Sequence, residues 1–254
     1  MVGVLVLLFG PAQYSHAAEH VFNIYFGGTG LADKSWKEGV ARWGTSNLIG
    51  TLFHYDTTIK ENKKFIPGVG ALPYCKGKQL DQQRTPHKRK GRAWDQTIMQ
   101  AKSFLRKRLG KVDAKDVVTV NVVGHSRGAV AAMWFVHSAN ADKTVTGFKN
   151  RRFNIIALDP VPGVNLKTGK IGDVTHIGLK RFVLDEEVAH FVGIYVEDER
   201  DSRFGALVPT IKKSNKTTQT LKLSVRGAHQ TIVGNMQKEG HPSLALKTEK
   251  KIYK

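Results

Sequence analysis

Three residues that together can activate a serine hydroxyl occur in this chain, each just after an apolar run. Ser126 lies within Gly-His-Ser-Arg-Gly, Asp159 follows Phe-Asn-Ile-Ile-Ala-Leu, and His229 comes shortly after Thr-Leu-Lys-Leu-Ser-Val. A serine hydroxyl is a poor nucleophile at neutral pH unless a histidine takes its proton and a carboxylate orients that histidine. The three residues therefore predict a nucleophilic triad that works through an acyl-enzyme.

The serine lies at a predicted elbow between a strand and a helix. Residues 117–123 are rich in Val and Thr, as in a strand buried on both faces, and residues 129–136 are a small, apolar run typical of a buried helix. A serine at such a turn takes strained backbone angles, and Gly124 and Gly128 lack the bulk that would hold strand and helix apart. A Gly-x-Ser-x-Gly pattern alone also fits a tight turn with a surface serine, but its flanks here favour a nucleophile.

Backbone N–H groups near the serine are candidates for binding the oxyanion. The N–H of Arg127 falls at the start of the predicted helix, where unpaired donors and the helix dipole favour a negative charge. The alternating strand predicted from residue 20 ends in Gly-Gly-Thr-Gly, and a second donor is expected there from Gly28 or Thr29. A simple β-turn is an equal alternative for this glycine-rich segment.

The elements that must position these residues alternate between strands and helices. Apolar residues recur at helical spacing over 92–109, and Gly110 can end that helix. Residues 153–158, 188–196 and 220–225 read as further buried strands beside 117–123. Four buried strands separated by helical segments predict an α/β fold similar to the α/β-hydrolases, with a mostly parallel sheet and helices on both faces.

The first half of the chain gives weaker patterns. Residues 31–50 suggest a helix with scattered apolar positions, and residues 51–55 a short strand. The segment 65–70 is a turn-rich loop that the sequence does not explain. His190 lies in the middle of a predicted strand, where a structural role is favoured over a catalytic one.

The amino-acid composition indicates which classes of partner the protein can bind. Forty Lys and Arg against 21 Asp and Glu give a formal net charge of +19, which favours polyanionic partners. No nucleic-acid-binding motif appears and the aromatic residues lie in apolar patterns, so nucleic acid is not expected and anionic lipid is favoured. The basic run 84–92 reads as a solvated loop that can hold the protein on anionic lipid, and residues 56–92 are a candidate lid. No metal or cofactor is expected.

The start of the sequence resembles an export signal. Residues 1–10 are apolar and uncharged, and Ser15-His16-Ala17 is a small-x-small site for cleavage before Ala18. We therefore expect a signal peptide at 1–17, a single catalytic domain at 18–254 with no transmembrane segment, and a secreted or periplasmic protein. A buried first strand is the alternative, because the segment lacks Lys and Arg near its start. The lone Cys75 allows no intramolecular disulfide.

Several motifs match, in order across nearly all of the mature chain, those of a known family. They are Phe-Gly-Gly-Thr-Gly at 26–30, Pro-Gly-Val-Gly at 67–70, Gly-x-Ser-Arg-Gly-Ala at 124–129, Leu-Asp-Pro-Val at 158–161, a segment with His190, Asp198, Glu199, Arg200 and Phe204, and one with Gly227, His229, Val233 and Gly234. On these motifs the chain resembles the catalytic domain of the type VI secretion lipase effectors and their wider family of bacterial α/β-hydrolases.

The resemblance implies Ser126 as nucleophile, Asp159 as the acid and His229 as the base. This sequence departs from the family pattern at Gly27, in the histidine loop at 230–232 and at Asn235. The resemblance and the basic charge together favour a serine hydrolase that cleaves phospholipid esters. A soluble carboxylesterase or thioesterase, or a catalytically silent polyanion-binding protein on a hydrolase scaffold, are the alternatives.

Overall fold

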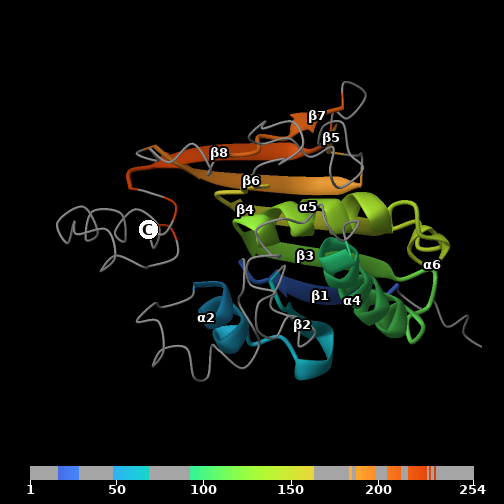
Figure 1. The fold of residues 1–254 in the computed structure, drawn as a ribbon. Helices are drawn as coiled ribbons and strands as arrows, with labels where there is room; N and C mark the ends of the chain where they lie inside the picture. Colours follow the sequence, from blue (N-terminus) through green and yellow to red (C-terminus); the bar gives the residue numbers. More distant parts are fainter. Residues whose placement is uncertain are drawn as a thin grey trace, which may run out of the picture.

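Six parallel strands form one sheet at the centre of the computed structural model (Figure 1). The structure describes residues 17–28, 48–68, 92–162, 183–184, 187–197, 205–212 and 217–227, together with 229 and 232. The strands are β1 (Glu19–Phe26), β2 (Lys63–Ile66), β3 (Val117–His125), β4 (Arg151–Leu158), β6 (Val188–Val196) and β8 (Gln219–Val225). Their order across the sheet is β2-β1-β3-β4-β6-β8, so the predicted serine follows a central strand.

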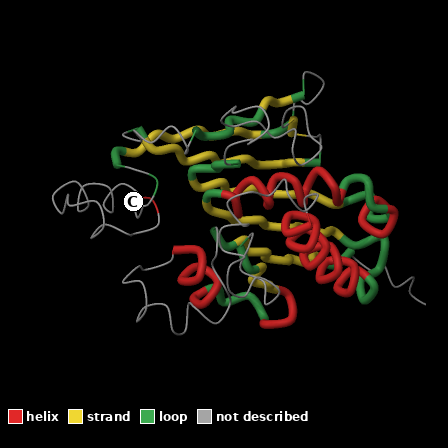
Figure 2. Tube along the Cα trace, in the orientation of Figure 1, coloured by secondary structure: helices red, strands yellow, loops and turns green. Residues whose placement is uncertain are grey.

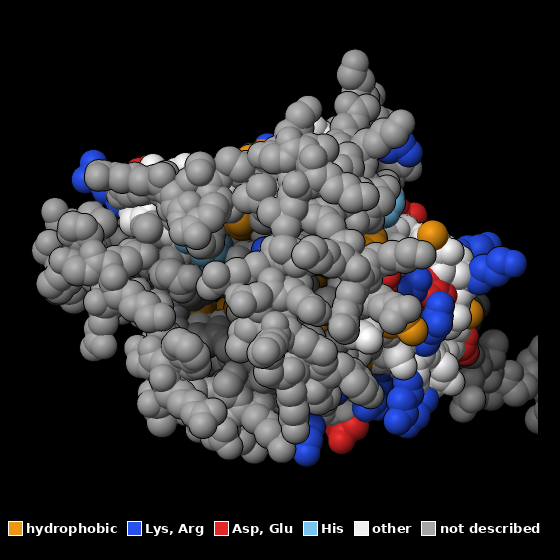
Figure 3. Space-filling model, in the orientation of Figure 1, with side chains coloured by type: hydrophobic (Ala, Val, Ile, Leu, Met, Phe, Trp, Pro, Cys, Tyr) orange, Lys and Arg blue, Asp and Glu red, His pale blue; other side chains and the backbone are white. Residues whose placement is uncertain are grey.

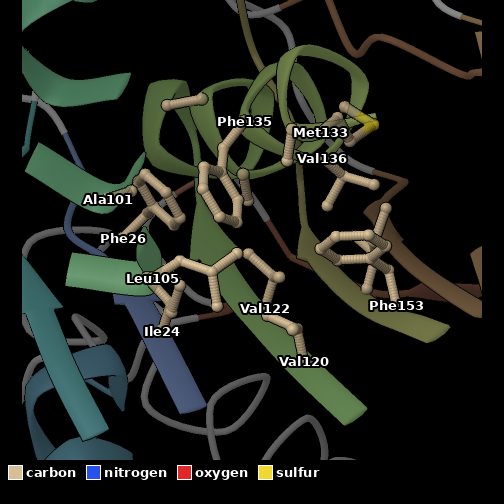
Figure 4. Packing of buried hydrophobic residues seen from close by; sticks show 14 of the residues in the cluster. Ile24, Phe26, Ala101, Leu105, Val120, Val122, Met133, Phe135, Val136 and Phe153 are labelled. Carbon is tan, nitrogen blue, oxygen red and sulfur yellow. The ribbon is translucent and has the colours of Figure 1, made fainter. Parts of the chain in front are cut away.

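Two helices cover one face of this sheet. The helix α4 (Arg92–Leu109) and the helix α5 (Arg127–Ala139) lie over the strands on this face (Figure 2). Their apolar side chains pack on those that β1, β3 and β4 direct to the same face. Figure 4 shows how Leu105 and Phe135 meet Ile24 and Val122. Among the described residues, no helix is both long and apolar enough to cross a membrane.

A third helix lies against the opposite face. The helix α2 (Leu48–Tyr55) contributes Leu48 and Ile49 to a second buried cluster, which includes Tyr25 and Phe65 from the sheet. The alternation of β1 explains the two clusters, because Ile24 and its neighbour Tyr25 point to opposite faces. The predicted α/β fold with a parallel sheet and helices on both faces is confirmed.

Shorter elements complete the described structure. The 3₁₀-helix η1 (Lys60–Asn62) precedes β2, and the helix α6 (Lys143–Thr146) follows α5. The strands β5 (Val183–Leu184) and β7 (Thr210–Ile211) form a separate parallel pair.

The strand predicted at residues 51–55 is wrong, because these residues belong to α2. Leu48 and Ile49 are buried in the second cluster and Phe53 packs on it, the i and i+4 spacing of a helix face. The explanation is that this tertiary contact outweighs the strand preference of Phe53 and Tyr55.

Two further expectations about strands need correction. The loop predicted at 65–70 begins with the last two residues of β2, a short strand that lies at one edge of the described sheet beside β1. The strand β8 was expected to be buried, yet all of its residues except Val225 are exposed. Among the described strands β8 pairs with β6 alone, so it lies at the edge of the sheet, where burial is lower.

The expected helix at 31–50 is described only from Leu48 onward, where it is helical. The basic run 84–91, the segment 163–182 and the chain after 232 lie outside the described residues, as do Cys75 and the proposed signal through residue 16.

Candidate active site

The sharp turn at Ser126 joins β3 directly to α5. Ser126 has φ 57° and ψ −129°, a region that residues with a side chain rarely adopt. Its N–H donates to the carbonyl of Leu158 at 3.0 Å, and its own carbonyl accepts from Ala129 N at 3.0 Å. The strain is therefore held by bonds to a neighbouring strand and to the first turn of α5.

Glycine on both sides of the serine is a steric requirement. A Cβ atom added at Gly124 would lie 2.5 Å from the carbonyl oxygen of Gly128, and one at Gly128 would lie 2.5 Å from that of Phe26. Both distances are shorter than real Cβ contacts, so strand and helix would have to separate. This agrees with the role predicted for these two glycines.

The structure brings the three predicted triad residues together. The Nε2 atom of His229 lies 2.8 Å from Ser126 Oγ, and its Nδ1 atom lies 2.5 Å from Asp159 Oδ2. All three residues are buried, with exposed fractions of 6% for Ser126, 0% for Asp159 and 2% for His229. Because an ionised carboxylate only accepts hydrogen bonds, Nδ1 of His229 carries the proton, which leaves Nε2 as the acceptor for the serine hydroxyl.

Asp159 is held at the end of β4 by the neighbouring strand β6. Its N–H donates to Ile194 O at 2.7 Å, and Val196 N lies 3.4 Å from its Oδ1. Asp159 has φ 39°, and it and Ser126 are the two non-glycine residues with positive φ in the described part of the chain. The two strand ends that carry the serine and the carboxylate are therefore both strained.

A second histidine adjoins the triad. The ring of His125 stacks on that of His229 with centroids 4.7 Å apart, and its Nε2 lies 3.3 Å from the carbonyl oxygen of His229. A carbonyl only accepts, so Nε2–H of His125 is the donor. Burial and the neighbouring His229 lower the pKa of His125 to about 3, so it stays neutral near pH 7.

Sequence reasoning missed His125 as a functional residue. The two-residue period of a strand places His125 on the same face as Val123. Val123 packs in one cluster with Val225 and Ile232, which precede and follow His229 in the sequence. This period was the one signal in the sequence that could have placed His125 on the side of the sheet where His229 lies. It could not show that the loop with His229 would lie over that face, because no local pattern fixes the path of the loop.

The predicted oxyanion positions lie beside the elbow as far as they are described. Arg127 is the first residue of α5, whose leading N–H groups have no acceptor within the helix. A Cβ atom added at Gly28 would lie 3.0 Å from Nδ1 of His125, and one at Gly68 would clash with the carbonyl oxygen of Gly28. Gly28 is therefore packed tightly between Gly68 and the elbow. Thr29 lies outside the described residues.

His190 belongs to a different set of contacts. Its Nδ1 lies 2.8 Å from Asn154 Oδ1, and side-chain hydrogen bonds continue from Asn154 to Asn121 and from Asn121 to Asn23. These four residues occupy one row across β1, β3, β4 and β6. His190 thus takes no part in the hydrogen-bonded triad, which agrees with its interpretation as a structural residue. Asp198 is not among the described residues.

No site for a metal emerges from the described residues, which hold no group of three or more His, Cys, Asp or Glu placed to share an ion. The chemistry that this arrangement can perform is nucleophilic attack by a serine with general-base assistance from a histidine.

The sequence has no match among family models or curated proteins. This chain is similar to a solved structure of the Tle1 effector bound to the VgrG spike from the type 6 secretion system. The match covers 86% of this chain and 51% of the other, with 17% sequence identity and a TM-score of 0.49. The chain therefore spans about half the length of that solved structure.

Proposed function

We propose that this protein is a serine hydrolase that cleaves carboxylic esters of lipids, foremost phospholipids. In this proposal Ser126 is the nucleophile, His229 the general base and Asp159 the acid that orients His229. The observation that carries the proposal is the buried hydrogen-bonded series from Ser126 through His229 to Asp159, which starts and ends at strained strand ends. Structural serines and histidines have no need of strain at both ends.

The reaction proceeds in two halves. Oγ of Ser126 attacks the ester carbonyl carbon while Nε2 of His229 takes the hydroxyl proton, and Asp159 stabilises the imidazolium that forms. The tetrahedral intermediate collapses when the alcohol leaves with that proton, and the acyl group stays on Ser126. Water then attacks the acyl-enzyme with the same assistance, which releases the carboxylic acid and restores the serine.

The negative charge on the carbonyl oxygen requires donors that are already in place. The N–H of Arg127 at the start of α5 is the first donor that we assign, and the second comes from Gly28 or Thr29 in the loop after β1. The tight packing of Gly28 against His125 and Gly68 supports the assignment of Gly28, because these neighbours hold its N–H in one position.

His125 is assigned as a positioning residue for the base. Its hydrogen bond to the His229 carbonyl ties the histidine loop to the end of β3, next to the serine. Because His125 is neutral, its ring can lie against the His229 imidazolium of the intermediate without charge repulsion.

Apolar surroundings and positive charge support a lipid substrate. Val123, Leu158 and Ile232, each close in sequence to a triad residue, belong to one buried apolar cluster. The net charge of +19 favours an anionic surface such as phosphatidylglycerol. Figure 3 shows Lys and Arg side chains gathered near α4 and α6, where the last turn of α4 carries Arg106, Lys107 and Arg108.

We also propose that residues 1–17 direct export and are removed, which leaves one catalytic domain at 18–254 in the periplasm or outside the cell. The small-x-small motif before Ala18 is the support for this cleavage.

One assay distinguishes the proposed activity from its alternatives. Purified protein and its Ser126→Ala variant are incubated with phosphatidylglycerol vesicles, phosphatidylcholine vesicles and a short-chain soluble ester, at low and high salt. The proposal predicts fatty-acid release that depends on Ser126, is faster on the anionic vesicles and falls with salt. Turnover of the soluble ester alone would indicate a carboxylesterase, and salt-sensitive binding to vesicles without turnover of any ester would indicate a polyanion-binding protein.

A further inference from the structure

Both carboxylate oxygens of Asp116 accept hydrogen bonds, one from Ala18 just before β1 and one from His20 within it. The backbone N–H of Ala18 donates to Oδ1 at 2.9 Å, and Nε2 of His20 lies 3.0 Å from Oδ2. Asp116 immediately precedes β3, and its side chain is only 10% exposed. The carboxylate therefore joins the start of β1 to the start of the strand that leads to Ser126.

In the described part of the chain, this carboxylate has no permanent cation beside it. Among the described residues no Lys or Arg pairs with Asp116, and His20 is its one titratable partner. Asp142 offers a comparison within the same molecule, since its side chain is 3% exposed and it pairs with both Arg106 and Lys102. Enclosed carboxylates are ordinarily paired with a cation.

The charge on Asp116 is nevertheless favoured. Hydrogen bonds from His20 and from the Ala18 N–H lower the pKa of Asp116 below its ordinary value. The other charged groups close to it in sequence, Asp113 and Lys115, pair with each other at 3.5 Å. An ionised carboxylate thus faces Ala18 N, and a positive charge on that nitrogen would form an ion pair with it.

The chain at this point is open to a peptidase. Ala17 and Ala18 are exposed, whereas Ala18 O already accepts from Val117 N at 2.9 Å. Ala18 is therefore fixed to the sheet just after the bond that the small-x-small motif marks for cleavage.

We propose that Asp116 is the binding site for the α-ammonium group that Ala18 gains when the Ala17–Ala18 peptide bond is hydrolysed. Water supplied to a signal peptidase breaks that amide, which leaves a carboxylate on Ala17 and, at neutral pH, an ammonium on Ala18. The nitrogen keeps its place on Oδ1 and gains the positive charge that Asp116 lacks. Processing then strengthens the attachment of β1 to β3. This inference rests on the proposed cleavage and is independent of the proposed hydrolase activity.

The test compares two forms of the processed protein that differ only in the charge of Ala18. Full-length protein is cleaved with purified signal peptidase, and N-terminal sequencing identifies the first residue. Half of the product is then acetylated selectively at its α-amine, which removes the charge and keeps an N–H. Thermal unfolding of both forms is followed across pH in the wild type, in Asp116→Asn, and in His20→Gln, which keeps a side-chain donor without the titratable ring.

We expect a sequence that begins at Ala18 and a Tm that is about 2–4 °C higher for the free amine than for the acetylated form, because only the free amine carries a charge that can pair with Asp116. Pairing raises the pKa of the α-amine above the ordinary value of about 8. The stabilisation is therefore complete between the pH at which Asp116 ionises and about 8, and it is lost as pH rises through the raised pKa of the amine. It should persist in His20→Gln and vanish in Asp116→Asn.

Equal Tm values for the two wild-type forms, the same difference in Asp116→Asn, or a first residue other than Ala18 would overturn the inference. If Asp116→Asn does not fold, NMR titration of the Ala18 α-amine in the processed wild type decides instead, because an α-amine that titrates at about 8 contradicts the pairing.

Discussion

The ring of His125 lies stacked on the ring of His229, 4.7 Å between centroids and 27° between planes. The two residues are 104 positions apart in sequence, and the hydrogen bond from Nε2–H of His125 to the His229 carbonyl joins the strand before the serine to the loop that carries the proposed base. The orientation of His229 therefore depends on a residue adjacent to Ser126 as well as on Asp159.

Two substitutions separate the hydrogen bond of His125 from its ring stacking. His125→Gln places an N–H donor close to the position of Nε2 but removes the ring, whereas His125→Phe keeps a ring and removes the donor. We expect His125→Phe to lower kcat about five- to tenfold with little change in KM, and His125→Gln to retain more of the wild-type kcat. Steady-state kinetics on a soluble ester measure both. A fully active His125→Phe beside an impaired His125→Gln would show that stacking matters and the bond does not.

The low pKa of His125 predicts acid sensitivity of the fold. An unfolded histidine takes up a proton below about 6.5, whereas burial keeps His125 neutral in the folded chain down to about 3. The stability from this neutral histidine is therefore complete above about pH 6.5 and is lost as pH falls toward 3, by at most about 1.4 kcal/mol per pH unit. Urea unfolding of wild type and His125→Phe across this range should show a shallower slope for the variant. Parallel slopes would contradict the burial of a neutral His125.

Much of the architecture was predictable from periodicity. Helix α4 and strand β6 have the bounds that the sequence indicates, because each has a long and regular apolar pattern. The order of Ser126, Asp159 and His229 after their strands also predicted which side chains would meet, since the carboxyl ends of parallel strands lie along one edge of a sheet.

What the sequence could not predict depends on neighbours distant in the chain. The exposure of β8 follows from its place beside β6 at the sheet edge, and local pattern does not encode strand order. The strand β2 is four residues long, too short for a clear alternation, and is held by pairing with β1. The contacts of His125 and Asp116 likewise need the tertiary structure, because their partners lie 104 and 98 positions away.

The close packing of Gly28 predicts a specific cost in activity. A Cβ atom in Gly28→Ala would lie 3.0 Å from Nδ1 of His125, so the ring must move by a few tenths of an ångström. We expect kcat to fall about tenfold while thermal stability stays close to wild type, because small errors in catalytic geometry are costly. Gly110→Ala is the matched control, since its Cβ would be 3.6 Å from the nearest atom. Equal kcat values for the two variants would refute the role of this contact.

The ion cluster at Asp142 predicts lower stability with unchanged catalysis, the reverse of the effect expected for Gly28→Ala. Asp142 pairs with Arg106 and Lys102 from α4 and accepts from Thr144 N at the start of α6. Asp142→Ala should lower the free energy of unfolding by about 2–3 kcal/mol, because it removes a cap and leaves two cations without their partner. Asp113→Ala, which breaks an exposed pair with Lys115 and an exposed hydrogen bond from Lys115 N, should cost about 1 kcal/mol or less. Urea unfolding measures both, and a similar loss for the two variants would contradict this account.

The central claim is that Ser126 is a nucleophile activated by His229 and Asp159. A fluorophosphonate probe bonds covalently to such a serine, and peptide mass spectrometry locates the adduct. We predict an adduct on Ser126 in the wild type, no adduct in Ser126→Ala, and labelling slowed by several orders of magnitude in His229→Ala, since the serine of an intact triad owes most of its reactivity to the base. An unlabelled wild-type Ser126, or equal labelling rates in wild type and His229→Ala, would contradict the claim.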